Sequence, residues 1–537
     1  MYTVLVALLM AVTVIAQAEK APHENPVTPE KVLLGKMLFW EEQLSGDDSM
    51  ACGSCHQPEH GGADGRFTIG LHPGFDGVFD TADDLRGSHS LVRQANGGEF
   101  TVSPLFGLRP QATPRSSPSV LGAGHHRFLN WDGSAGETFI DPESGATLIV
   151  SGGALEVQAL EPILDPVEMG YEGRTWRDVT TKLGAVEPMH LASNLTPDIQ
   201  AALQQYGNYP SLFAWAFGDA QISASRIAFA LASYERTLDP DQTAWDRYVE
   251  GDPSAMTSLE VVGWDLFRTS GQCLKCHSAP LFTDGSFHAV GLRPAAQDPG
   301  FGNGAFKTPS LRNAGLRPRL FHTGNSERLG HPSQFWDGRS TLNVHWLGGG
   351  NATVAGASPS DLPDLNALGV TQNEVALMFE FVRTALVDER AKYGLPPFDH
   401  PDLRGLVEPP PRLYGASVPG NLEPFLVDWV PSYPGNSAFK LGLVGGQPGS
   451  IALLAIAFES HEPHVTVSGL PWNLNVLTWI SFLLDGAPGE PGHATWFVPL
   501  PNDPAFATVP LYYQMFCTDQ TAPGGIAASQ GTEFFIR

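Results

Sequence analysis

The chain has 537 residues, 42% of them hydrophobic, which is enough apolar material for several packed domains. Only 16% of the residues are charged, yet the formal net charge is -26. This acidic balance argues against nucleic acid and anionic membranes as partners and suits a soluble protein that attracts a basic partner.

The first 18 residues predict an export signal. They are apolar and end in Ala16-Gln17-Ala18, a small-residue cleavage pattern. The run is short for a membrane span and has no Lys or Arg before Lys20, so a buried N-terminal helix or an anchor is the alternative. We expect residues 1–18 to be removed and the mature chain to be periplasmic or extracellular, without a membrane span.

Two motifs combine two cysteines with a histidine. They are Cys52-Gly-Ser-Cys55-His56 and Cys273-Leu-Lys-Cys276-His277. Each could be half of a zinc site, a redox dithiol or the attachment site of a c-type haem. Four thiolates complete a zinc site without histidine, and a dithiol does not explain the second copy. A c-type haem uses every residue, because the thiols form thioethers and the imidazole binds iron, so we predict two covalent haems with His56 and His277 as iron ligands.

The segments that follow the two motifs echo each other. Residues 117–123 recur as 308–314, and residues 128–133 resemble 321–324, which indicates a duplicated haem lobe. Helical periodicity is clearest in 223–236, 258–269 and 371–387. The segments 61–118 and 285–309 are rich in Gly, Pro, Asp and Ser and predict long loops.

The composition changes near residue 408. Short apolar runs then alternate with Pro and Gly turns, at 451–458, 465–467, 495–500, 509–516 and 533–536. This pattern predicts an all-β, sandwich-like accessory domain at 406–537 with a structural or surface-attachment role and no chemistry. Its single cysteine, Cys517, is predicted to be a buried thiol, and with so few cysteines a disulfide scaffold is excluded.

Three segments, 225–238, 276–288 and 305–313, resemble the bacterial di-haem cytochrome c peroxidases and the related MauG proteins. The likeness runs from about residue 29 to residue 391. It implies a multidomain fold of two mostly α, cytochrome c-like haem lobes, which we place at 19–222 and 223–405, ahead of the β domain. It also implies that the N-terminal haem activates peroxide and the C-terminal haem passes electrons.

The segment 158–169 resembles the distal segment of this family, with Gln158 and Glu168 at the catalytic positions. A carboxylate near the iron can relay the peroxide proton, and an amide can orient the peroxide. Trp131 matches the tryptophan that the family places between the two haems, which implies an electron relay. The structural alternatives are a loop-capping Glu168 and a core-packing Trp131.

The resemblance also bears on the remaining iron ligands. His72 follows His56 at a spacing similar to that of the displaceable histidine of the peroxidases, and its rivals are His60, His89, His125 and His126. The segment 340–349 matches the region that supplies Met or Tyr to the second haem, but no Met occurs between Met256 and Met378. The indole of Trp346 offers iron no lone pair, so we predict His345 as that ligand.

The family commonly holds calcium between its lobes through an Asn side chain and two backbone carbonyls. The matching positions are Ser116, Arg317 and Arg319, and two arginines make a hard oxygen site less favourable. The acidic cluster Asp76, Asp80, Asp83 and Asp84 is a second calcium candidate or a solvated loop.

Three functions compete. The first is a peroxidase that reduces hydrogen peroxide with electrons from a small cytochrome c or cupredoxin. The second is a MauG-like or oxygenase-like enzyme that oxidises a protein or organic substrate. The third is a non-enzymatic electron carrier joined to a surface-binding module. Gln158 and Glu168 favour the two enzymes, because a carrier needs no acid–base pair.

Overall fold

The computed structural model describes residues 21–66, 70–81, 83–289, 292–324, 326–327, 370–407, 411–420, 422–503, 505, 507 and 509–536. The expected export signal at 1–18 and the predicted ligand His345 lie outside these residues. Within these ranges, we find no helix with the length and apolar character needed to cross a membrane.

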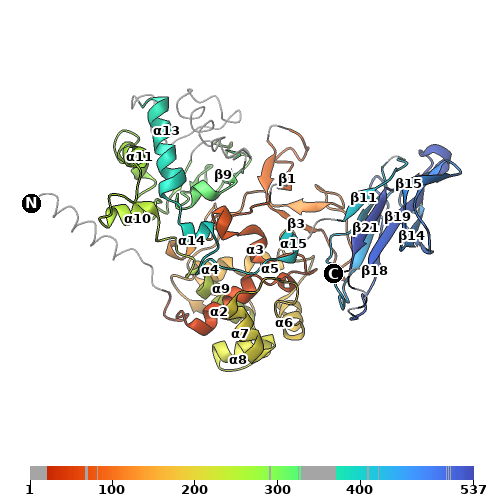
Figure 1. Ribbon diagram of the computed structural model, residues 1–537, viewed down its shortest axis with the longest axis horizontal. Helices are drawn as coiled ribbons and strands as arrows, with labels where there is room; N and C mark the ends of the chain where they lie inside the picture. The colour runs from red at the N-terminus through yellow and green to blue at the C-terminus, as the bar shows by residue number, and fades with distance from the viewer. Residues whose placement is uncertain are drawn as a thin grey trace, which may run out of the picture.

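Helices dominate the chain before residue 408, and strands dominate the chain after it (Figure 1). The helices are α2 (Pro29–Phe39), α3 (Cys52–Cys55), α4 (Ala154–Gln158), α5 (Glu161–Leu164), α6 (Trp176–Ala185), α7 (Pro197–Tyr206), α8 (Tyr209–Phe217), α9 (Ala224–Glu235), α10 (Ala244–Val249), α11 (Ser258–Arg268), α13 (Gln372–Glu380), α14 (Glu389–Lys392) and α15 (Arg404–Val407). The helices predicted at 223–236, 258–269 and 371–387 are confirmed as α9, α11 and α13, and α13 continues as a π-helical turn, Phe381–Ala385.

Each cysteine motif follows a helix that packs closely on a helix much later in the chain. In the first pair, α2 packs on α9 at Gly35, where an added Cβ would lie 1.9 Å from the carbonyl oxygen of Ala230. In the second pair, α11 packs on α13 at Gly263, where a Cβ would lie 2.1 Å from the carbonyl oxygen of Leu377. The two pairs belong to separate hydrophobic clusters, so each motif stands on its own packed core.

The prediction of long loops at 61–118 and 285–309 is wrong in part, because short antiparallel strand pairs interrupt both segments. The pairs are β1 (Gly70–His72) with β2 (Leu85–Gly87), β3 (His89–Val92) with β4 (Pro110–Ala112), and β7 (Phe287–His288) with β8 (Phe306–Lys307). A further hairpin, β5 (Phe139–Ile140) with β6 (Thr147–Ile149), separates Trp131 from Gln158, and β9 (Arg319–Leu320) pairs with β10 (Ser326–Glu327). Strands of two to four residues are too short to show an alternating apolar pattern.

The C-terminal part is β-rich, as predicted, and all its strand pairs are antiparallel. One sheet has the order β11-β21-β19-β14-β17 with β20 beside β19, a second has the order β12-β13-β18, and β15 pairs with β16. The strands are β11 (Arg412–Tyr414), β12 (Phe425–Val427), β13 (Lys440–Val444), β14 (Ile451–Ala457), β15 (Ser460–Val467), β16 (Leu470–Leu474), β17 (Thr478–Leu483), β18 (His493–Phe497), β19 (Pro510–Thr518), β20 (Ile526–Ala528) and β21 (Gly531–Phe535).

The two larger sheets share one hydrophobic core. Leu454 and Met515 enter it from the first sheet, and Leu441 and Leu443 from the second. Cys517 is a free, buried thiol within this core, as predicted. The core also takes side chains from the β3–β4 hairpin, which belongs to the part of the chain before residue 408.

Candidate haem and peroxide site

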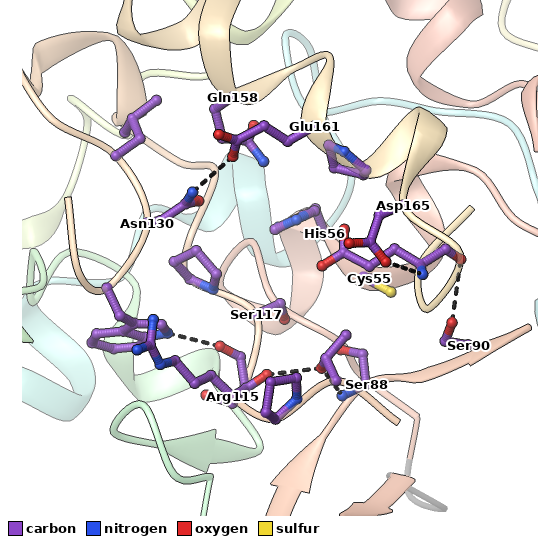
Figure 2. A pocket seen from close by; sticks show the side chains of 18 of the residues that line it. Cys55, His56, Ser88, Ser90, Arg115, Ser117, Asn130, Gln158, Glu161 and Asp165 are labelled. Carbon is purple, nitrogen blue, oxygen red and sulfur yellow. Dashed lines mark hydrogen bonds between the residues drawn. The ribbon is translucent and has the colours of Figure 1, made fainter. Parts of the chain in front are cut away.

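A cavity of about 920 Å³ lies beside the first cysteine motif, within the size range of cofactor sites. All the residues predicted for the N-terminal haem line it, namely Cys52, Cys55, His56, His72, Trp131, Gln158 and Glu168. Figure 2 shows His56 between Gln158 and Glu161 on one side and Arg115 and Ser88 on the other. Residues from α3, α4, α5 and the long segment before α4 therefore meet around one space.

Both motif histidines are held in the tautomer that an iron ligand needs. The Nδ1 atom of His56 lies 3.2 Å from the carbonyl oxygen of Gly62, and Nδ1 of His277 lies 3.0 Å from the carbonyl oxygen of Phe282. A carbonyl only accepts, so Nδ1 donates its proton and Nε2 keeps a lone pair for a metal. Burial lowers the pKa of both imidazoles, which keeps them neutral.

The side chains of the motif cysteines lie in surroundings that disfavour the thiolate. Burial raises the pKa of Cys55 and of Cys273 to about 12. Zinc ligation and dithiol exchange both need a thiolate, whereas a thioether carries no charge. Among the described residues, no cluster of potential metal ligands contains cysteines of both motifs. The cluster that is found consists of Cys276, Asp284 and His288. The site therefore fits covalent haem better than a shared zinc ion.

Glu168 has a carboxyl group suited to proton exchange near neutral pH. The Asp165 carboxylate accepts hydrogen bonds from the amides of Val167 and Glu168, at 2.7 and 3.2 Å, and so fixes the turn after α5. Burial, and then the negative charges of Asp165 and Glu161, raise the pKa of Glu168 to about 7. A general base is most effective when its pKa lies close to the working pH.

The sequence interpretation missed several charged groups of the cavity, among them Glu161 and Arg115. Glu161 accepts a hydrogen bond from Asn130 Nδ2 at 2.9 Å. Beside burial, the negative charges of Asp165 and Glu161 contribute to the raised pKa of Glu168. Arg115 pairs with Asp132 at 2.6 Å and with Asp298 at 2.7 Å. Asp132 directly follows the candidate Trp131, but no pattern in the sequence links it to Arg115, 17 residues away.

Two of the five candidate histidines, His72 and His89, line the cavity. The Nδ1 atom of His72 accepts a hydrogen bond from the Gly74 amide at 3.2 Å, so its neutral ring carries the proton on Nε2. Binding of His72 to iron would therefore require a change of tautomer or the loss of this hydrogen bond. The buried Nδ1 of His89 has no hydrogen-bond partner within the part of the chain that the structure describes. His72 thus stays a prediction, with His89 as its rival.

Trp131 joins the two halves of the helical part. Its side chain is buried, and Nε1 donates to the carbonyl oxygen of Ser116 at 2.7 Å. Its own carbonyl accepts from the Lys307 amide at 2.8 Å. Its ring contacts the ring of His322 edge-on, with 6.2 Å between the ring centres. The His322 ring in turn stacks on Phe306, with 3.6 Å between the ring centres. A continuous aromatic contact therefore leads from the cavity into the half that carries His277.

The residues at the expected calcium position do not fit that ion. Arg317 donates to the carbonyl oxygens of Ser117 at 2.7 Å and of Arg319 at 3.4 Å, and Ser116 Oγ donates to the carbonyl oxygen of Phe321. Burial lowers the pKa of Arg317 to about 10, so the guanidinium is charged at neutral pH. A cation of the chain itself thus binds the Arg319 carbonyl, one of the oxygens that calcium would need.

In the acidic cluster, carboxylates of Asp83 and Asp84 already accept hydrogen bonds from backbone amides of the chain. The Asp83 carboxylate accepts from the amides of Phe75 and Asp76, and the Asp84 carboxylate accepts from the amide of Asp80. These carboxylates stabilise the turn between β1 and β2, as Asp side chains commonly do in loops. They give no support to a second calcium site.

Comparisons with known proteins place the chain in a family. Residues 29–254 match the family model of the di-haem cytochrome c peroxidases. MauG of Methylophilus methylotrophus is 32% identical over 58% of this chain and 72% of that protein. Cytochrome c551 peroxidase of Nitrosomonas europaea is 26% identical over 60% of this chain and 78% of that protein. The crystal structure of a MauG-like protein associated with microbial copper homeostasis aligns over 71% of this chain and 96% of that chain, with 23% identity and a TM-score of 0.47.

The fold, the cavity and these relatives define an oxidoreductase with haem chemistry. The chain belongs to the MauG and di-haem cytochrome c peroxidase family. The prediction of two covalently bound c-type haems is thereby confirmed, and the non-enzymatic carrier loses its support.

Proposed function

We propose that the protein is a peroxidase that reduces hydrogen peroxide with electrons from a small redox protein, a cytochrome c or a cupredoxin. The observation that carries this proposal is the Glu168 carboxyl, with its pKa near 7, in the same cavity as Gln158 and His56. Cys52 and Cys55 would attach the haem of this cavity and His56 would ligate its iron. The haem supplies the metal that binds peroxide and the electrons that cleave it.

The residues of the cavity divide the work on peroxide. Glu168 takes a proton from one peroxide oxygen and returns it to the other, so that water can leave. The Gln158 amide orients the peroxide and stabilises the charge that develops as the bond breaks. Burial, with the charges of Asp165 and Glu161, keeps the pKa of Glu168 high, which lets its carboxyl give the proton back.

The pH dependence of the peroxide reaction tests this function. Glu168 must be ionised to take a proton, and with its raised pKa it is ionised only above about pH 7. We therefore expect the second-order rate constant for peroxide to rise from acid to neutral pH with a midpoint near 7, in stopped-flow experiments that follow the haem absorbance. A pH-independent rate, or no peroxide-dependent oxidation of reduced cytochrome c or cupredoxin, would contradict the proposal.

The electron path is proposed to cross two cytochrome c-like lobes, at 19–222 and 223–405. Cys273, Cys276 and His277 would hold the second haem, and Trp131 would relay electrons between the haems. The aromatic contact from Trp131 to His322 supports this path. We further propose that the mature chain is exported, to the periplasm or beyond. The apolar first 18 residues indicate an export signal, and thioether attachment of haem is consistent with an exported protein.

A MauG-like oxidation of a protein or organic substrate is the second candidate. The sequence has no Met between Met256 and Met378, so a thioether from that segment cannot ligate the second iron, and His345 is proposed instead. Two histidine ligands give a lower potential than a His–Met pair, which suits the second haem poorly to high-potential peroxidase donors.

The substitution His345→Ala tests this ligand. We expect it to change the near-infrared and EPR signatures of one haem and to leave the other unchanged, because one imidazole would be lost from one iron. His331→Ala, a histidine in the same stretch of sequence, is the matched control and should change neither signature. A near-infrared band of thioether ligation in the parent protein would exclude His345 as the ligand of the second iron. That result would favour a peroxidase over the MauG-like function.

A further inference from the structure

The β3–β4 hairpin reaches from the haem cavity into the core of the C-terminal sheets. In Figure 1, β3 lies between the helical part and the C-terminal strands. Phe100 is 2% exposed and sits in the same hydrophobic cluster as Leu443 and Met515, together with Val92 and Leu108 of the hairpin. The core of the β-rich region is therefore completed by side chains from the other part of the chain.

Polar contacts fix the tip of this hairpin as well. The amide of Phe100 donates to Thr495 Oγ1 at 2.9 Å. The Lys440 ammonium donates to Gln94 Oε1 at 2.6 Å and to the carbonyl oxygen of Gly98, and lies 4.9 Å from the Phe100 ring centre. Lys440 is buried, so these contacts replace the water that its charge would otherwise need.

The base of the same hairpin holds the backbone of the segment that carries Glu168. Gln111 Nε2 donates to the carbonyl oxygen of Pro166 at 2.8 Å, and Ser90 Oγ donates to that of Glu168 at 3.3 Å. Beyond the end of β3, the amide of Glu172 donates to the carbonyl oxygen of Gln94 at 3.1 Å. The hairpin thus holds the backbone of Glu168 and of residues on both sides of it.

We propose that the C-terminal β-rich region is a brace for the peroxide site, and that Phe100 is the positioning residue through which it acts on Glu168. The inference rests on the function proposed for Glu168. It gives the region a part in the chemistry, beyond the structural or surface-attachment role expected from sequence. A catalytic group that shifts by about 1 Å can lose a large part of its rate enhancement. A hairpin that is anchored at both ends would therefore keep the peroxide reaction fast by holding Glu168 in place.

The test compares Phe100→Ala with Phe534→Ala in the haem-loaded full chain. Phe534 lies in the same core, is 6% exposed and stacks on Tyr513, but it belongs to β21. Both variants remove the same ring from the same core. We expect Phe100→Ala to slow the reaction with peroxide about tenfold, to move the midpoint of its pH profile and to speed amide hydrogen exchange in residues 166–172. Phe534→Ala should do none of these.

Two outcomes would overturn the brace: equal effects of both variants on residues 166–172, or no effect of Phe100→Ala on rate and exchange. If Phe100→Ala does not fold, Phe100→Leu gives the same comparison with Phe534→Leu, with smaller effects expected. The exchange measurement separates this inference from the proposed function. Faster exchange at 166–172 with an inert Glu168→Gln would leave the mechanical link intact and defeat only the catalytic role of Glu168.

Discussion

Replacement of Glu168 by Gln is expected to slow the reaction with hydrogen peroxide by about 10²- to 10⁴-fold, the loss typical of a missing general acid–base group. Glutamine keeps the size and hydrogen-bonding capacity of the side chain but cannot accept and return a proton. Stopped-flow measurement of the second-order rate constant gives the effect directly. The haem spectra should not change, because Glu168 is not proposed as an iron ligand.

Glu161→Gln is the matched control for this variant. It removes one carboxylate from the same cavity but leaves the Glu168 carboxyl in place. Because the charge of Glu161 helps to raise the pKa of Glu168, the control should move the pH midpoint to a lower value with little loss of the maximal rate. Equal losses in both variants, or full activity of Glu168→Gln with intact haem spectra, would show that Glu168 does not carry the proton.

Gly35→Ala is expected to lower the free energy of unfolding by about 3 kcal/mol, which is large for one methyl group. The added Cβ would lie 1.9 Å from the carbonyl oxygen of Ala230 and 2.9 Å from Tyr234 Cβ, so α2 and α9 would have to separate. Denaturant unfolding of the haem-loaded protein, followed by circular dichroism and by haem absorbance, measures the loss.

Gly184→Ala is the control for this substitution. Gly184 lies in α6, where the nearest atom to an added Cβ is Ile222 Cδ1 at 3.8 Å. Alanine is the better helix former, so this variant should gain up to about 1 kcal/mol. Similar effects at Gly35 and Gly184 would mean that the close approach of α2 and α9 does not limit stability.

Local patterns in the sequence predicted the parts of this protein that local chemistry defines. The two cysteine motifs, the helix that becomes α9 and the strand that becomes β19 can all be recognised within fifteen residues. The distal segment 158–169 was recognised by resemblance, and its residues do line the cavity with His56. Each of these features depends on neighbours in the chain.

Features that depend on distant partners were not predictable in this way. Arg115 finds Asp298 across 183 residues, and the Phe100 amide finds Thr495 across 395 residues. Neither residue stands in a pattern that names its partner. The change of composition near residue 408 marks where the C-terminal strands begin. The hydrophobic core of these strands nevertheless includes Phe100, from the part of the chain before this boundary.

The buried guanidinium of Arg317 has a consequence for how the two halves stay together. A bound metal ion stabilises a protein by mass action, so its contribution falls as the ion becomes scarce in the surrounding medium. Arg317 is part of the chain, and its bonds to the carbonyl oxygens of Ser117 and Arg319 involve no dissociation equilibrium. The contribution of these Arg317 hydrogen bonds therefore does not depend on the calcium concentration of the habitat.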